Sequence, residues 1–120
     1  MRRELRRSQV EPFFAKLPPT EVVLEACGGS HHWGRVLQAL GHTVRLIPPQ
    51  YVTPFVKRAK NDRNDALAIS EAAARPNIND VPVKSAEQQA ARMVLSIRDR
   101  VVRQRTQVIN QLRGQLADRA

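Results

Sequence analysis

Residues 20–47 read TEVVLEACGGSHHWGRVLQALGHTVRLI, and this stretch decides the fold. Residues 20–26 are rich in Val and Leu and predict a buried strand. Residues 31–40 predict a helix, because their apolar side chains recur on one helical face. Residues 43–47 predict a second strand. Two strands joined through a helix by short turns predict a parallel pair with a right-handed crossover, so the chain belongs to the α/β class.

Local signals mark the ends of these elements. Ser30 is a good cap for the following helix, and Gly41 is a good terminator. Pro48 and Pro49 end the second strand, and we expect a loop from there to Asn61.

Helices are predicted on both sides of this unit. Residues 8–15 predict a short helix capped by Ser8, with Glu11 completing a capping box. Residues 62–74 predict a helix whose alanines allow close packing. Residues 76–84 predict a connector, with a short strand as an alternative within it. Residues 85–116 predict one long amphipathic helix.

Composition restricts the function. The chain has 120 residues, enough for one domain, a net charge of +9 and only 4% aromatic residues. This charge favours a polyanionic partner, nucleic acid before an anionic membrane, although a basic protein without a specific partner fits it too. With so few aromatic residues, phosphate contacts from arginine would carry most of the binding. Cys27 is the only cysteine, which fits a reducing cytoplasm, and no apolar run reaches the about 18–20 residues of a membrane span.

The most informative polar motif is KNDRNDA, residues 60–66. Asp62 and Asp65 are three residues apart, which places both carboxylates on one face of a helix. Two neighbouring carboxylates repel each other unless a cation or a proton lies between them, so the motif suggests a metal site. Simple capping by Asn61 or Asp62 is the alternative, because acidic residues are common in any first helical turn.

Glu25 is a third candidate, at the carboxyl end of the first predicted strand. Functional side chains gather at that end of parallel sheets. A carboxylate in an apolar strand is costly unless it is paired or exposed, so the alternative is that Glu25 simply meets water. A zinc site made of Cys27, His31, His32 and His42 is disfavoured, because their spacing fits no common zinc pattern.

The long helix carries an apolar stripe. Its members follow spacings of three, four and seven: Met93, Ile97, Val101, Val108, Leu112 and Leu116. Arg105 falls in the gap of the stripe. The length predicts a coiled-coil partner or packing across another chain, and the alternative is that the helix folds back on its own domain.

Several of these segments resemble one known family. They are LEACGGSHHW (24–33), VRLIPPQYV (44–52), KRAKNDRNDA (57–66), VPVKSAEQQ (81–89), RQRTQ (103–107) and NQLRG (110–114). In this order they are similar to the DEDD transposases of bacterial insertion sequences, insertion-sequence type 110. The resemblance covers nearly the whole chain from about residue 8.

The resemblance implies a partial ribonuclease-H/RuvC-like nuclease domain over residues 1–84, with a small parallel sheet and helices. It implies a long basic helix, a coiled-coil segment, over residues 85–120. The family's carboxylates carry over to Glu25, Asp62 and Asp65 as catalytic ligands of Mg²⁺ or Mn²⁺, which prefer oxygen donors. The predicted nucleic-acid-binding residues are Lys57, Arg58, Lys60, Arg63, Arg98, Arg103 and Arg105.

The chain also departs from the family pattern. The family's first aspartate lies on an earlier strand, and before Glu25 this chain has no aspartate. The family's C-terminal domain with its nucleophilic serine finds no match here. We therefore expect a truncated or internal fragment, with one edge of the 20–26 strand unpaired and no transposase activity by itself.

The expected function is that of a piece of a bacterial, cytoplasmic DNA transposase or recombinase that binds DNA. In intact relatives such an enzyme catalyses metal-dependent transposition. The expected partners are DNA, a structured guide RNA and further copies of the chain bound through residues 85–120, with no membrane. The alternative is an inactive remnant that only binds nucleic acid or oligomerises.

Overall fold

The computed structural model describes residues 3–56 and 61–119. The chain divides into two compact units, Met1–Ser85 and Ala86–Ala120. The first unit is α/β with a small parallel sheet, and the second is one long helix. The predicted fold class is confirmed at this level, whereas the RuvC-like assignment stays a prediction.

The sheet of the first unit is the predicted parallel pair. Strand β1 (Glu21–Glu25) pairs with β2 (Thr43–Ile47) in register, from Glu21 opposite Thr43 to Glu25 opposite Ile47. Helix α2 (Ser30–Ala39) forms the crossover between them. In the described ranges β1 has no strand on its other edge.

Gly41 ends α2 as predicted, but Ser30 does not cap it. Gly41 has a φ of 90°, and it donates to Gln38 O while His42 N donates to Leu37 O, the paired bonds of a Schellman motif. The cap position is Gly29, and Ser30 is the first helical residue. The Ser30 hydroxyl instead donates to Cys27 O and accepts from Cys27 N, so this backbone turn takes the bonds that a cap would make.

Helix α1 (Arg7–Ala15) begins one residue before the prediction. Arg6 occupies the cap position, and its N–H donates to the Gln9 side chain at 2.9 Å. The predicted cap by Ser8 and the box with Glu11 are therefore wrong, because the capping box lies two residues earlier.

The predicted loop after Pro49 is also wrong. Residues Pro49–Val52 form the short helix α3, and Thr53–Phe55 form the 3₁₀ turn η1. Proline at the first helical position fixes a helical φ at little cost, so these prolines start a helix as well as ending a strand. Helix α4 (Asp62–Ala73) follows, within one residue of its predicted end.

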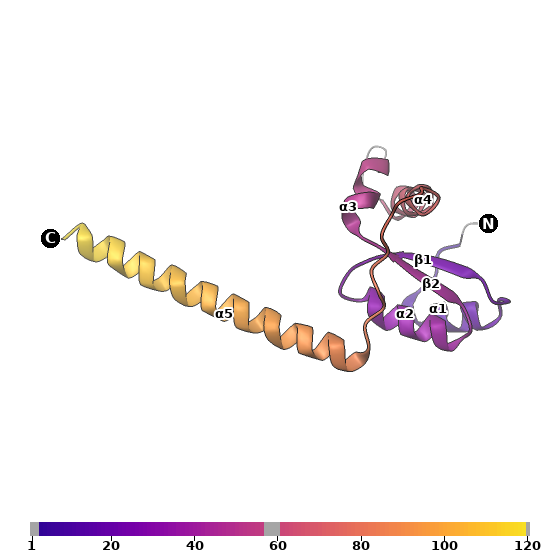
Figure 1. The fold of residues 1–120 in the computed structure, drawn as a ribbon, viewed down its shortest axis with the longest axis horizontal. Helices are drawn as coiled ribbons and strands as arrows, with labels where there is room; N and C mark the ends of the chain where they lie inside the picture. Colours follow the sequence, from indigo (N-terminus) through magenta and orange to yellow (C-terminus); the bar gives the residue numbers. More distant parts are fainter. Residues whose placement is uncertain (1–2, 57–60, 120) are drawn as a thin grey trace. The chain divides into compact units, whose positions relative to one another are not determined.

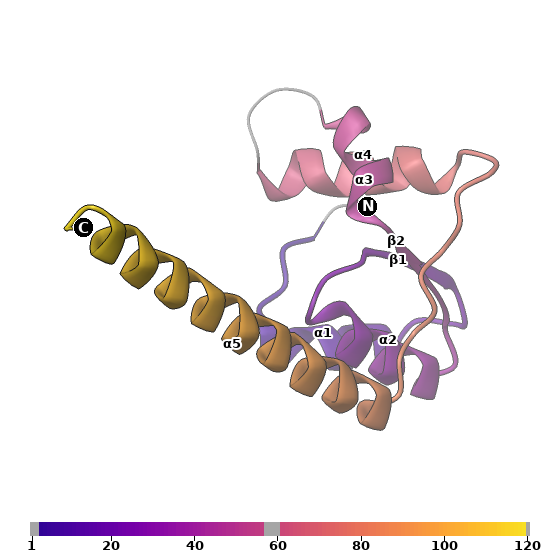
Figure 2. The same cartoon turned by 60° about the vertical axis from the view of Figure 1, so that its left-hand side comes forward.

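The first unit has three layers, visible in Figures 1 and 2. Helices α1 and α2 cover one face of the sheet, and α3 and α4 cover the other. Neighbouring residues of a strand point to opposite faces of the sheet, so the buried side chains of Leu46 and Ile47 pack into different helical layers. The cluster on the α4 side contains Ile47, Val52, Ala68 and Ala72, of which the two alanines let α4 approach the sheet closely.

The connector after α4 returns to the sheet at one point. Val81 forms an antiparallel bridge with Leu46, and its N–H donates to Leu46 O at 2.7 Å. Close packing of α2 against this side depends on Gly34. A Cβ added there would lie 3.1 Å from both methyl groups of Val83.

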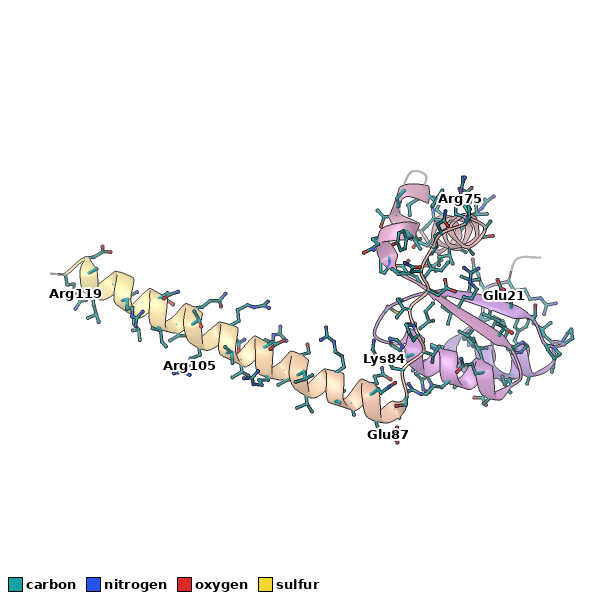
Figure 3. The ribbon with its side chains drawn as sticks, in the orientation of Figure 1. Glu21, Arg75, Lys84, Glu87, Arg105 and Arg119 are labelled. Atoms are coloured by element: carbon teal, nitrogen blue, oxygen red, sulfur yellow. The ribbon has the colours of Figure 1, made fainter. Side chains whose placement is uncertain are left out.

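The second unit contains α5 (Ala86–Ala117), a helix of 32 residues with no buried residue. It follows the predicted range with a shift of one residue at each end. Figure 3 shows side chains projecting all along this helix, with Arg105 labelled near its middle. Across the described residues, no helix combines the length and hydropathy that a membrane span requires.

Candidate metal and nucleic-acid site

Glu25 is the last residue of β1 and is half-buried. Alternation along the strand puts Glu25 on the same sheet face as Val23, which packs against the cluster that includes Ala68 and Ala72 of α4. The carboxylate therefore lies at the carboxyl end of the strand, on the face that α4 covers. The position at the strand end fits the sequence prediction, whereas its role as a metal ligand stays a prediction.

Asp62 and Asp65 belong to the first turn of α4. The cap is Asn61, whose side-chain oxygen accepts from Asn64 N at 2.9 Å, so neither aspartate serves as the N-cap. This observation removes one of the two capping alternatives, capping by Asp62. Asp62 is exposed and Asp65 is half-buried, and both lie at the positive end of the helix dipole.

Helix α4 crosses over the strands and is seen nearly end-on in Figure 1. Val23 of β1 and Ala66 of α4 line the same groove, a hollow of about 390 Å³. Ala66 follows Asp65 directly, and Val23 precedes Glu25 by two residues, or about 7 Å along a strand. Val23 and Ala66 thus share one groove, which neither Glu25 nor Asp65 lines.

Arg45 of β2 holds the other end of α4 to the sheet. Its guanidinium donates to Ala73 O at 3.1 Å and lies 3.5 Å from Glu21, which Figure 3 labels on β1. It also forms a two-pronged ion pair with Asp80, at 2.8 and 3.1 Å. The hydrogen bond to Asp80 is the main cause that raises the pKa of Arg45 above its ordinary value, and the Coulomb attraction of Asp80 and the contact with Glu21 add to it.

Asp62 also borders a second hollow, of about 570 Å³, on the N-terminal segment. Arg3, Glu4 and Arg6 line this hollow together with it. Two arginines and one glutamate of the N-terminal segment therefore line the same hollow as one candidate ligand. In the parts of the chain that the structure describes, no three acidic, His or Cys side chains are close enough together to hold a metal ion.

The predicted nucleic-acid-binding residues fall into three groups. Lys57, Arg58 and Lys60 lie outside the described residues. Arg63 is exposed in the first turn of α4, next to Asp62. Arg98, Arg103 and Arg105 are exposed on α5.

Two histidines are buried for structural reasons. His42 accepts from Thr20 N at Nδ1, and its Nε2–H donates to Phe14 O at 2.9 Å, which ties α1 to the start of β2. His31 accepts from Lys84 N at 3.1 Å, and Arg35 donates to Lys84 O at 2.7 Å. Helix α2 therefore fixes the backbone of Lys84 on both sides.

Burial lowers the pKa of His31 below its ordinary value, and the charges of Lys84 and Arg35 lower it further. The sequence prediction did not include these contacts. Arg45 was missed too, although an arginine within the apolar strand TVRLI is itself a signal, because such a charge requires partners.

The comparisons with known proteins agree with one another. A family model for DEDD transposases of the IS110 type, described as transposase, matches residues 2–119. A Pseudomonas aeruginosa protein named "Probable family 20 transposase" is 56% identical over 117 residues, which cover 98% of this chain and 35% of the relative. The Coxiella burnetii "Transposase for insertion sequence element IS1111A" is 47% identical, with 97% of this chain and 32% of the relative covered.

A Yersinia enterocolitica transposase, for insertion sequence element IS1328, is 42% identical over 98% of this chain and 35% of its own length. The chain thus spans about a third of the length of these relatives. No solved structure matches the chain. Because the family model and the relatives each cover nearly all of its residues, the chain belongs to the DEDD transposase family of insertion-sequence type 110.

Proposed function

We propose that this chain is the carboxylate-bearing part of a transposase that acts on DNA, and that Glu25, Asp62 and Asp65 are ligands of a divalent metal ion. The observation that carries the proposal is that Glu25 lies at the carboxyl end of β1, on the sheet face that α4 covers, while Asp62 and Asp65 lie in the first turn of α4. Membership of a transposase family supports DNA as the partner.

The chemistry of the three side chains suits Mg²⁺ or Mn²⁺. Hard cations prefer carboxylate oxygens, and Mg²⁺ is usually held by one or two carboxylates together with substrate phosphates. The three carboxylates therefore need not form a closed cage without DNA. When bound, such an ion polarises a phosphodiester and orients the attacking nucleophile.

The protein's own part is to position these carboxylates. Arg45 fixes the C-terminal end of α4 to the sheet, and Asn61 fixes the helix start. Arg63, beside Asp62, is proposed to contact a DNA phosphate, because guanidinium groups bind phosphate in a two-pronged manner. Lys57, Arg58 and Lys60, which lie outside the described residues, are proposed from the sequence to contact DNA phosphates as well.

The metal proposal is tested by calorimetry. Mn²⁺ is titrated into the chain with and without a short DNA duplex, beside Asp62→Asn/Asp65→Asn and Glu25→Gln. We expect binding that DNA strengthens and that either variant weakens at least about tenfold. The matched control is Asp99→Asn on α5, which removes an acidic residue outside the proposed site. Equal binding by all four proteins would refute the metal assignment.

The DNA proposal is tested by salt dependence. Each phosphate neutralised adds about 0.9 to the slope of log affinity against log salt, for duplex DNA. Replacing Arg98, Arg103 and Arg105 by Gln is expected to lower this slope, and Arg63→Gln is expected to lower it by about one. An unchanged slope in both variants would exclude these residues as phosphate contacts.

Two further partners stay untested predictions. A structured guide RNA would use the same arginines, since RNA and DNA offer the same phosphate chemistry. Homo-oligomerisation through residues 85–120 is the other.

A further inference from the structure

A buried histidine of α2 holds the connector close to the end of the first unit. His31 is 7% exposed, and both of its ring nitrogens face Lys84, which Figure 3 labels beside α2. The backbone N–H of Lys84 donates to Nδ1 at 3.1 Å, and the Nζ of Lys84 lies 3.4 Å from Nε2. The first unit ends one residue later, at Ser85, so this contact fixes the chain just before α5 begins.

The protonation state of His31 decides which of these contacts is a hydrogen bond. A neutral imidazole has one N–H donor and one acceptor nitrogen, whereas an ammonium group has donors only. Because the backbone N–H of Lys84 donates to Nδ1, the neutral ring carries its proton on Nε2, where it faces the ammonium of Lys84. The neutral ring therefore accepts one hydrogen bond from Lys84. The imidazolium has two N–H donors and no acceptor, so it accepts none.

The charges that act on His31 are both positive. The ammonium of Lys84 approaches from the connector, and the guanidinium of Arg35 lies one turn further along α2. Burial lowers the pKa of His31 below its ordinary value, and these two charges lower it further. A proton on His31 therefore removes the hydrogen bond from the backbone of Lys84 and also adds repulsion between three cationic groups.

The neighbouring contact of the connector contains no ionisable group. Val81 N–H donates to Leu46 O at 2.7 Å, a bond between two backbone groups. Lys84, in contrast, is held at its N–H by His31 and at its carbonyl by Arg35, at 2.7 Å. Protonation of His31 thus acts on the hold at Lys84 and leaves the bridge between Val81 and the sheet unchanged.

We propose that His31 and Lys84 form a latch that a proton opens. With a neutral ring the latch is closed, and with the imidazolium residues 82–85 separate from α2 while the sheet stays folded. The opened segment lengthens the tether ahead of α5 by four residues, or up to about 14 Å at full extension. The latch lies apart from the proposed metal ligands and does not depend on the proposed function.

The test is amide hydrogen exchange of the full chain, followed by NMR in low urea at about pH 7.5 and about pH 5.5. We expect Lys84 N–H to exchange through a local opening that urea hardly promotes, because such an opening exposes little surface. Its protection, relative to an unstructured chain at the same pH, is expected to fall severalfold on acidification. The fall is at most about tenfold, because about pH 5.5 is one unit below the ordinary histidine pKa of 6.5. Val81 N–H is expected to stay more protected than Lys84 N–H at both pH values.

His31→Asn is the decisive variant, because asparagine keeps an acceptor for Lys84 N–H but does not titrate in this range. We expect the protection of Lys84 N–H to lose its pH dependence in this variant. The matched control is His42→Asn, since His42 is also buried and its Nδ1 also accepts from a backbone N–H, that of Thr20. Lys84 is expected to keep its pH dependence there. The ring of His31 in the unmodified chain gives a readout that needs no variant, and we expect the Nε2–H tautomer at about pH 7.5.

Four results would overturn the proposal. The first is a change of less than about twofold in the protection of Lys84 N–H between the two pH values. The second is an Nδ1–H tautomer of His31, because that nitrogen would then be no acceptor. The third is exchange of Lys84 N–H with the same urea dependence as Val81 N–H, which would mean that the latch opens only on unfolding. The fourth is a pH dependence that His31→Asn retains or that His42→Asn abolishes.

Discussion

The ion pair between Arg45 and Asp80 is expected to couple two segments of the first unit. Its two contacts, at 2.8 and 3.1 Å, join β2 to the connector after α4. The side chains are 24% and 36% exposed, so the pair lies between a surface contact and a buried one. Exposed pairs contribute about 0.2–1 kcal/mol, and hydrogen bonds to charged groups about 1.5–3 kcal/mol. We therefore expect a coupling energy of about 1–2 kcal/mol.

The perturbation is a double-mutant cycle made of Arg45→Met, Asp80→Asn and the double variant. Methionine keeps most of the alkyl stem, so packing changes little while the charge is lost. Arg45→Met also removes the bond to Ala73 O, and it is expected to cost about 2–3 kcal/mol in all. Asp80→Asn alone is expected to lower the free energy of unfolding by about 1–2 kcal/mol. Each kcal/mol corresponds to a fall in Tm of roughly 4–8 °C.

The assay is urea unfolding followed by the fluorescence of Trp33. It is the only tryptophan and lies in α2, so the signal reports the first unit without a contribution from α5. A coupling energy below about 0.3 kcal/mol, the usual error of additivity, would refute the reasoning. The two residues would then be independent in solution.

Two further predictions concern α2. His31 has a pKa lowered below 6.5 in the folded state, so the unfolded chain binds more protons as the pH falls through 6.5. The free energy of unfolding is therefore expected to fall between pH 7 and the folded-state pKa, with a slope of at most about 1.4 kcal/mol per pH unit. His31→Asn retains an acceptor for Lys84 N without titrating, and an identical pH profile for this variant would exclude His31 as the source. Gly34→Ala gains about 1 kcal/mol of helix propensity but crowds Val83 at 3.1 Å, and we expect a net loss of about 1 kcal/mol in urea unfolding. Adding Val83→Ala to the Gly34→Ala protein is expected to remove the crowding. As a control, Gly114→Ala, where an added Cβ meets nothing within 4 Å, is expected to raise the helix content of α5. A Gly34→Ala protein that is more stable than the unmodified chain would contradict the crowding argument.

Local patterns predicted the sheet well. The β2 range, 43–47, agrees at both ends, because a short Val- and Leu-rich run bounded by a glycine turn and two prolines has few alternatives. Gly41 was predictable for the same reason, since a positive φ after a helix favours glycine.

Competition between local hydrogen bonds limited the prediction of the helix caps. Ser30 and Ser8 look alike as caps in the sequence, yet the Ser30 hydroxyl serves the Cys27 turn and the Arg6–Gln9 box replaces Ser8. Nothing local distinguishes these outcomes, because each depends on where the chain before the helix runs.

Long-range contacts were least predictable. The partners of Arg45 are 24, 28 and 35 residues away, and His31 meets Lys84 at a separation of 53. Periodicity carries no information on such pairs. For the candidate site, Glu25, Asp62 and Asp65 came from strand-end and helix-start patterns and from family resemblance, and their joint role stays a prediction.

The open edge of β1 affects how readily copies of the chain associate in solution. Within the described residues β1 pairs on one side only, and its sequence EVVLE offers unpaired backbone groups beside apolar side chains, which is a template for joining other edges. The net charge of +9 keeps copies of the chain apart as long as it is unscreened. The Debye screening length falls to about 10 Å at 0.1 M salt. Added salt therefore weakens the electrostatic repulsion between copies of the chain, and with it the repulsion that keeps these strand edges apart. The same arginines that favour binding to a polyanion thus also oppose self-association through β1, because they repel other copies of the chain.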